Sequence, residues 1–156
     1  MTALEYTVEI ARPPEEVFAY LTDDLTRHSE WQENVARIRV EPEGRAKPGS
    51  KVVISRRIGR SERTFVSEIT EVDPPRSYAF RGIAGPVRPI GKDTVEPISG
   101  PRSRVTSRLD FEGHGLGKLL LPLVRRQARK ELRRDYERLK ERLETDHAEH
   151  STGRPA

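Results

Sequence analysis

Few residues of this chain have the types and spacing that metal binding requires. The 156 residues include no cysteine, so disulfides, thiolate nucleophiles and thiolate metal sites are excluded. The four histidines are scattered along the sequence, and two of them lie close to its end: His28, His114, His147 and His150. Metal-binding histidines usually occur in short, regular spacings. We therefore predict surface histidines, no bound metal and no cofactor.

One segment resembles a phosphate-binding loop but does not match it, and the commonest hydrolase motif does not occur. The segment GHGLGK, residues 113–118, resembles a phosphate-binding loop, but Glu112 stands where that motif needs glycine and Leu119 where it needs serine or threonine. We expect a flexible joint between a strand and a helix there. No Gly-x-Ser-x-Gly sequence occurs, so the most readable hydrolase signature is missing.

Paired carboxylates could serve acid–base catalysis, and two such pairs occur: Glu15 with Glu16, and Asp23 with Asp24. Adjacent residues of a helix do not face each other, so these pairs favour helix-dipole and solvation roles. The catalytic residues, if the chain has any, therefore stay unassigned at this level.

The elements that would position a site follow a clear order. Residues 4–11 alternate apolar and polar side chains with the two-residue period of a half-buried strand. Pro13 and Pro14 then suit the first turn of a helix, where a missing N–H costs nothing, and Glu15 and Glu16 face the positive end of its dipole. This pattern predicts a short helix over 14–22. Residues 26–34 form a second short helical piece or a tight loop.

Strand-like segments then alternate with glycine and proline turn signals, which favours antiparallel neighbours. They cover residues 35–40, 50–58, 63–72, 77–85, 91–98 and 103–113. Residues 116–144 predict one long amphipathic helix bent near Pro122. Its apolar side chains are Leu121, Val124, Ala128, Leu132, Tyr136, Leu139 and Leu143. Residues 146–156 lack apolar periodicity, so we expect one domain over residues 1–145 and a disordered tail over 146–156.

The size of such a sheet implies an internal pocket. Seven strands at about 4.8 Å spacing span roughly 30 Å, whereas a helix is only about 10–12 Å across. One helix covers this sheet only if the sheet curls around it, and four Phe, four Tyr and one Trp leave space unfilled. We therefore expect an α+β fold in which a curved antiparallel sheet of six to seven strands wraps around the C-terminal helix. The two short helices after the first strand would close one end.

Inward-facing side chains are the candidates to line that pocket, because small residues among large ones leave room for a ligand and hydroxyls could orient it. Core packing is the alternative for most of them. Trp31 is the one large aromatic in a polar segment, and it is either a lid of the pocket or a local packing residue. The predicted ligand-binding set is Trp31, Phe65, Ser67, Tyr78, Phe80, Ser107, Leu109, Leu121 and Val124.

Charge suggests partners only weakly. The net charge is +4, and the pI of 9.6 mainly reflects abundant arginine. Residues 125–142 hold nine Lys or Arg against four acids and could contact nucleic acid or an anionic membrane. The acids interrupt this basic face at ion-pair spacing, which favours a solvated surface. No apolar run has the length of a signal peptide or membrane span. We expect a cytoplasmic monomer or homodimer with no nucleic-acid partner and no membrane insertion.

Four segments carry a resemblance to a known superfamily. They are YTVEIARPPEEVFAYLTD, the tryptophan of HSEWQENV, EITEVDPPRSYAFRG, and LLLPLVRRQARKELRRDYERLKERLE. Together they resemble the polyketide cyclase/dehydrase branch of the START-like, helix-grip (SRPBCC) superfamily over residues 4–144. The resemblance implies a hydrophobic small molecule held between the sheet and the C-terminal helix, with the short helices framing the cavity mouth.

Three functions remain open, because fold alone does not name a reaction. The first is a binding or carrier module for a hydrophobic or aromatic, polyketide- or lipid-like molecule. The second is a cyclase or dehydratase that acts on a polyketide-like substrate, with a pocket tyrosine or arginine as the acid. The third is a protein-interaction module that uses the basic helix.

Overall fold

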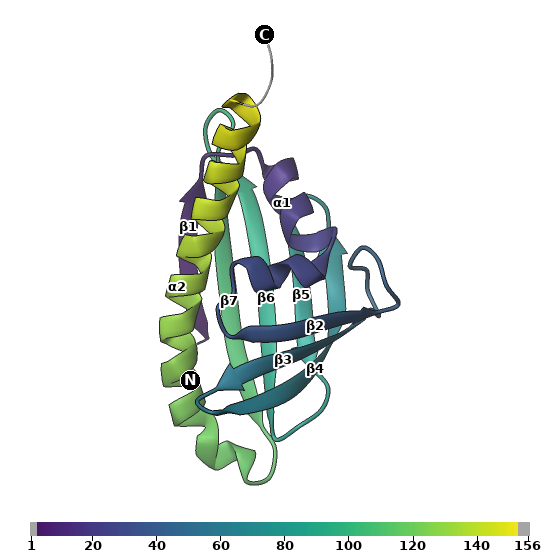
Figure 1. Cartoon of the computed structure of the whole chain (residues 1–156). Helices are drawn as coiled ribbons and strands as arrows, with labels where there is room; N and C mark the ends of the chain where they lie inside the picture. The colour runs from purple at the N-terminus through teal and green to yellow at the C-terminus, as the bar shows by residue number, and fades with distance from the viewer. Residues whose placement is uncertain (1–2, 153–156) are drawn as a thin grey trace.

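A computed structural model of the chain describes the backbone of residues 3–152 and the side chains of residues 3–145. Seven antiparallel strands form one curved sheet in the order β1-β7-β6-β5-β4-β3-β2, and the long helix α2 runs along it (Figure 1). The strands are β1 (Leu4–Ile10), β2 (Val35–Glu41), β3 (Lys51–Ile58), β4 (Ser61–Asp73), β5 (Ser77–Gly82), β6 (Val87–Pro97) and β7 (Ser103–Gly113). The predicted α+β helix-grip architecture is confirmed.

Two short helices separate β1 from β2, as the sequence predicts. Helix α1 (Pro14–Thr22) begins at Pro14, and it buries Val17, Phe18 and Leu21 against the sheet. The 3₁₀ helix η1 (Leu25–Glu30) follows directly, and Asp24 caps it by accepting a hydrogen bond from the backbone N–H of Thr26. Figure 1 places both helices in front of the middle strands of the sheet.

The C-terminal helix α2 (Gly117–Thr152) packs mainly against β1 and β7 and more lightly against β6. From Ala128 onward its predicted apolar stripe is buried in the main core cluster, whereas Leu121 and Val124 are only half-buried. At its far end, the buried Arg12 donates hydrogen bonds to the carbonyl oxygen of Leu143. None of the described helices is long and apolar enough to cross a membrane.

Residue pairing across the strands fixes which side chains share the concave face. Tyr78 lies opposite Asp93, which in turn lies opposite Ser107. In the next inward row, Phe80 lies opposite Gly91, which lies opposite Leu109. Since side chains alternate between faces along a strand, both rows face α1 and α2.

The sixth strand is longer than predicted, because β6 begins at Val87 and includes Pro89. The sequence pattern predicts a start at residue 91. Pairing between β5 and β6 ends at Arg81 and Ile90, so Pro89 lies where β6 has only β7 as its partner. The missing N–H of Pro89 therefore costs no bond to β5, as at the edge of a sheet.

The joint between β7 and α2 is tightly packed, so the expectation of a flexible joint is wrong. A Cβ atom on Gly117 would lie 1.9 Å from the carbonyl oxygen of Pro86, and one on Gly113 would lie 2.7 Å from the Cα of Lys118. The backbone N–H of His114 also donates a hydrogen bond of 2.8 Å to the same Pro86 oxygen. Glycine is needed here because the chain segments touch.

The predicted tail remains a prediction. Helix α2 continues to Thr152, but the side chains of residues 146–152 are not described, and residues 153–156 lie outside the described residues.

Candidate ligand-binding site on the concave face

A buried carboxylate, that of Asp93, lies on the concave face of β6. The hydroxyl of Tyr78 donates a hydrogen bond of 2.8 Å to Asp93 Oδ2, and the hydroxyl of Tyr136 donates one of 2.5 Å to the same oxygen. Ser107 adds a third side-chain hydrogen bond. Strands β5, β6 and β7 and helix α2 therefore meet at one acidic group, which we call the Asp93 cluster (Tyr78, Asp93, Ser107 and Tyr136).

Burial dominates the electrostatics of the Asp93 cluster. It raises the pKa of Asp93 above that of an ordinary aspartic acid, although the hydrogen bonds from Tyr136, Ser107 and Tyr78 oppose the shift. Burial also raises the pKa values of Tyr78 and Tyr136 well above 10, so both hydroxyls stay protonated and keep donating at neutral pH. A carboxyl group in this setting is able to exchange a proton with a hydroxyl or enol placed beside it.

An aromatic surface adjoins the Asp93 cluster in the next row of the sheet. A Cβ atom on Gly91 would lie only 2.4 Å from Cζ of Phe80, so the ring of Phe80 occupies the space that any larger residue would fill. Phe80 packs against both hydrophobic core clusters but stays half-buried. Glycine at position 91 thus lets an aromatic ring lie across the concave face.

Trp31 follows η1 and belongs to the main core. It has no exposed surface, and its ring centroid lies 5.0 Å from that of Tyr136 and 5.0 Å from that of His28. Its Nε1–H is buried and has no hydrogen-bond partner among the described residues. Leaving a buried donor without a hydrogen bond costs about 1–3 kcal/mol. Trp31 therefore packs in the core and carries an unused hydrogen-bond donor. Its ring contacts Tyr136, which in turn bonds Asp93.

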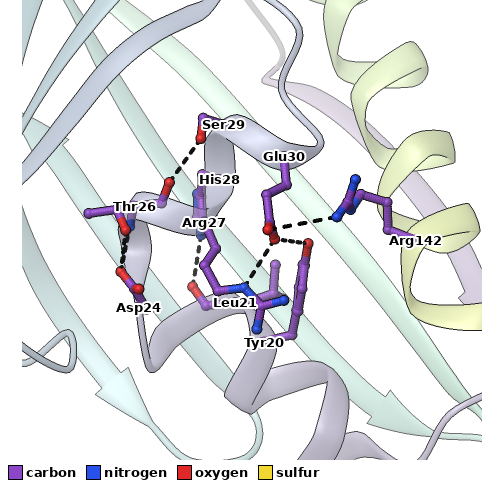
Figure 2. Close-up of polar contacts among 9 residues, drawn as sticks. All are labelled: Tyr20, Leu21, Asp24, Thr26, Arg27, His28, Ser29, Glu30 and Arg142. Carbon is purple, nitrogen blue, oxygen red and sulfur yellow. Dashed lines mark hydrogen bonds and ion pairs between the residues drawn. The ribbon is translucent and has the colours of Figure 1, made fainter. Parts of the chain in front are cut away.

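The position of Trp31 depends on how η1 is held (Figure 2). Glu30 accepts hydrogen bonds from the Tyr20 hydroxyl at 2.8 Å and from Arg27 Nε at 3.0 Å. Arg142 of α2 approaches the same carboxylate, with 3.7 Å between Arg142 Nη2 and Glu30 Oε2. Figure 2 shows Glu30 between α1 and α2, so its contacts with Tyr20 and Arg142 hold η1 against both helices.

His28 is buried, so the prediction of a surface histidine is wrong at this position, and its ring supports η1 from the inside. Its Nε2 lies 2.8 Å from the carbonyl oxygen of Leu21, and because a carbonyl only accepts, Nε2 carries the proton. Burial lowers the pKa of His28 to about 4, so the ring is neutral at neutral pH. Within residues 3–145 no group of three or more potential ligands could hold a metal ion. His114 is exposed, and the side chains of His147 and His150 lie outside the described residues.

A second polar group joins α2 to the segment between η1 and β2. Arg56 of β3 donates a hydrogen bond of 2.9 Å to Gln32, and Asn34 donates one to Glu131 of α2. Asp135 accepts a long hydrogen bond of 3.5 Å from the backbone N–H of Glu33. Burial raises the pKa of Asp135 to about 6.

The predicted site residues fall into four groups. Tyr78 and Ser107 meet at Asp93, while Phe65, Ser67, Phe80 and Leu109 share the same concave face. Leu121 and Val124 are half-buried near the start of α2, and Trp31 lies in the core. Contact of any of these residues with a ligand stays a prediction.

The sequence analysis missed Asp93 as a site residue and treated Tyr136 only as part of the helix stripe. The signal for Asp93 is its place in the alternation of β6, between the inward-facing Gly91 and Val95. An acid at an inward position of a strand is rare unless it is paired. This pattern alone would have identified Asp93 as a candidate site residue.

Solved structures with the same fold support the architecture. A START superfamily protein from Mycobacterium smegmatis superposes with a TM-score of 0.74 at 16% identity, over 93% of this chain and 99% of that one. The Zhui aromatase/cyclase from a Streptomyces species gives 0.63 at 21% identity, over 88% of this chain and 85% of that one. The di-domain aromatase/cyclase BexL, of the BE-7585A biosynthetic pathway, gives 0.72 at 18% identity over 92% of this chain. This chain spans only 47% of BexL.

No curated protein sequence matches this chain. The family described as polyketide cyclase/dehydrase and lipid transport matches residues 1–144, which is nearly the whole sequence. The strand order, the two short helices and the long C-terminal helix agree with that match. The chain therefore belongs to the polyketide cyclase/dehydrase and lipid transport family of the START-like, SRPBCC superfamily.

Proposed function

We propose that the protein binds a hydrophobic or aromatic small molecule, polyketide- or lipid-like, in a cavity between the concave face and α2. One observation carries the proposal: large apolar side chains on the concave face are only half-buried. Phe65, Phe80, Leu109 and Phe111 all belong to this set. A filled core would bury them, as it buries Val95 and Val105 in the same sheet.

The placement of α2 explains why Phe65 of β4 and Phe80 of β5 keep solvent contact. The helix packs chiefly on β1 and β7, at one edge of the sheet order, so β3, β4 and β5 lie toward the other edge. A ligand against Phe65 and Phe80 would remove their remaining apolar surface from water, which is worth about 25 cal/mol for each Å² buried.

Polar groups beside this apolar surface would orient the ligand. Asp93 is an acceptor shared by Tyr78 and Tyr136, and Trp31, whose ring packs against Tyr136, carries an unused donor at Nε1. Preformed pockets typically combine an apolar lining with a few convergent polar groups of this kind. A flat phenol or an enolised ketone would match both features.

Trp31 provides the test, because it is the only tryptophan and touches Tyr136 of the Asp93 cluster. We expect saturable changes in its emission on titration with polycyclic phenols or with fatty acids. Displacement of a bound fluorescent naphthalene sulfonate would confirm the binding independently of Trp31. Absence of saturation and displacement for both ligand classes would contradict the proposal.

A pair of variants separates a cavity from a filled core. Ser67 is buried on the concave face and Thr70 of the same strand is exposed. Ser67→Phe should abolish probe binding with little loss of stability if the space exists, whereas overpacking a filled core would cost about 1–3 kcal/mol. Thr70→Phe adds the same ring to the outside and should leave binding unchanged.

A second candidate function is cyclase or dehydratase activity, which the buried carboxyl group of Asp93 favours. In this reading Asp93 moves a proton on the substrate while Tyr78 and Tyr136 hold the carboxyl group in place. Asp93→Asn should then bind a linear poly-β-ketone analogue with near-normal affinity and fail to form an aromatic product, which absorbance would detect. Equal product formation by the wild type and Asp93→Asn would contradict this role.

A further inference from the structure

The start of α2 exposes a cluster of leucines that no part of the proposed cavity uses. Their exposed fractions are far above those of the remaining apolar stripe: 82% for Leu116, 79% for Leu119, 67% for Leu123 and 47% for Leu120. We call these four residues the leucine patch. Single exposed leucines are common on soluble proteins, but a group of four within eight residues marks an interaction surface.

Helix geometry explains why the patch points away from the sheet. Leu119 and Leu123 are four residues apart and share one face of α2, opposite the face that carries the buried Ala128 and Leu132. Pro122 interrupts the hydrogen bonding of these first turns. In Figure 1 they lie at the lower end of the molecule, at a bend in the helix.

The patch is also held in a fixed position. The contact of Gly117 with Pro86 locks the beginning of α2 onto the connection between β5 and β6. That connection itself carries another exposed apolar side chain, Ile83, at 37%. The leucines are thus presented by a rigid joint, which lowers the conformational entropy lost when they dock.

Positive charge surrounds the patch. Residues 114–130 contain no aspartate or glutamate, and they include four exposed cations: Lys118, Arg126, Arg129 and Lys130. In the part of the chain that the structure describes, these four form no ion pair. Arg126 and Lys130 continue the same helix face as Leu119 and Leu123, at spacings of three, four and seven residues.

We propose that the leucine patch docks on the surface of an anionic lipid bilayer. The leucines would enter the boundary between head groups and acyl chains, and the neighbouring cations would contact lipid phosphates. A second copy of the chain fits less well, because a two-fold interface would bring the same unpaired cations together. Nucleic acid would satisfy the cations and leave the leucines in water.

Vesicle sedimentation of the full chain tests this docking. We expect binding to phosphatidylcholine vesicles that contain phosphatidylglycerol, weaker binding to phosphatidylcholine alone, and release by salt. Leu119→Ser with Leu123→Ser should weaken partition by roughly tenfold or more, because two buried leucine side chains are lost. Arg126→Gln with Lys130→Gln should weaken partition on anionic vesicles by roughly tenfold.

A matched control removes the same charge elsewhere. Lys47→Gln with Lys51→Gln lies at and just before the start of β3, next to the edge strand β2 and away from β7 in the strand order, and should retain binding. Unfolding curves should be unchanged for all three double variants, since every altered side chain is exposed.

Two results would overturn the proposal. One is that the wild type and the leucine variant partition equally onto anionic vesicles, or that neither of them binds. The other is a homodimer in sedimentation velocity that dissociates in the leucine variant, which would assign the patch to a second copy. Ligand displacement measured in parallel reports on the cavity alone, so either proposal can fail without the other.

Discussion

The two ends of α2 both carry leucines and cations, but these side chains lie in opposite environments. Between Leu132 and Leu143 the apolar side chains are buried, and cations reach carboxylates, as Arg134 reaches Glu33 at 2.9 Å. Between Leu116 and Lys130 four leucines are exposed, and four cations have no ion-pair partner among residues 3–145. Apolar periodicity tells which residues share a helix face, but only the neighbouring elements decide whether that face is covered.

The largest expected contrast comes from placing the same charge at each end. Leu139 has no exposed surface, so Leu139→Asp would bury an unpaired carboxylate and remove core packing, at a cost of roughly 5 kcal/mol or more. That approaches the whole stability of a typical domain, and we expect an unfolded or insoluble protein. Leu123→Asp should unfold within about 0.5 kcal/mol of the wild type in urea. Equal losses for both variants would mean that the start of α2 is also buried.

Truncation gives the next contrast. A chain that ends at Arg142 loses the buried Leu143, the carbonyl that Arg12 bonds, and Glu144, which accepts from the backbone N–H of Ala11 at 2.9 Å. We expect a loss of about 3 kcal/mol, seen as a lower urea midpoint. A chain that ends at Thr145 keeps these contacts.

The chain that ends at Thr145 therefore tests the predicted tail. Its Tm should match that of the full chain within about one or two degrees. A much larger drop would show that residues 146–156 dock on the rest of the protein, and the domain boundary would have to move.

Sequence patterns predicted the elements better than the site, for a physical reason. Alternation in β7 and the proline-led start of α1 are local signals, and both elements appear with the expected bounds. The Asp93 cluster depends on pairing between strands and on α2, which are distant in sequence. The tight joint at Gly117 likewise depends on Pro86, so local composition suggested flexibility where packing demands glycine.

Two buried groups, Asp135 of α2 and His28 of η1, should respond to acid in opposite directions. Asp135 has its pKa raised to about 6 from 3.8, so the folded state holds the proton more tightly and stability falls as the pH rises through that window. His28 has its pKa lowered to about 4 from 6.5, so stability falls as the pH drops through that window. In the wild type the two effects partly cancel.

Single variants would separate the contributions of Asp135 and His28 to the pH dependence of stability. On going from neutral pH to about pH 4, Asp135→Asn should lose about 1–2 kcal/mol more stability than the wild type, because one pK unit equals about 1.4 kcal/mol and solvent contact reduces the effect. His28→Gln should lose less than the wild type over the same range. Urea unfolding across the pH series measures both. Parallel stability curves for the three proteins would rule out these two groups as the source of the response.

The smallest expected effect compares one paired and one unpaired arginine of α2. Arg134 is partly exposed and contacts Glu33 and Asp135, so Arg134→Gln should cost about 0.2–1 kcal/mol. Arg126 forms no ion pair among the described residues, so Arg126→Gln should leave stability unchanged and affect only vesicle binding. Added salt should narrow the gap between Arg134→Gln and the wild type, because it screens an exposed pair. If Arg126→Gln proves as destabilising as Arg134→Gln, the cations at the start of α2 have structural partners. Their charge would then be unavailable to a lipid surface.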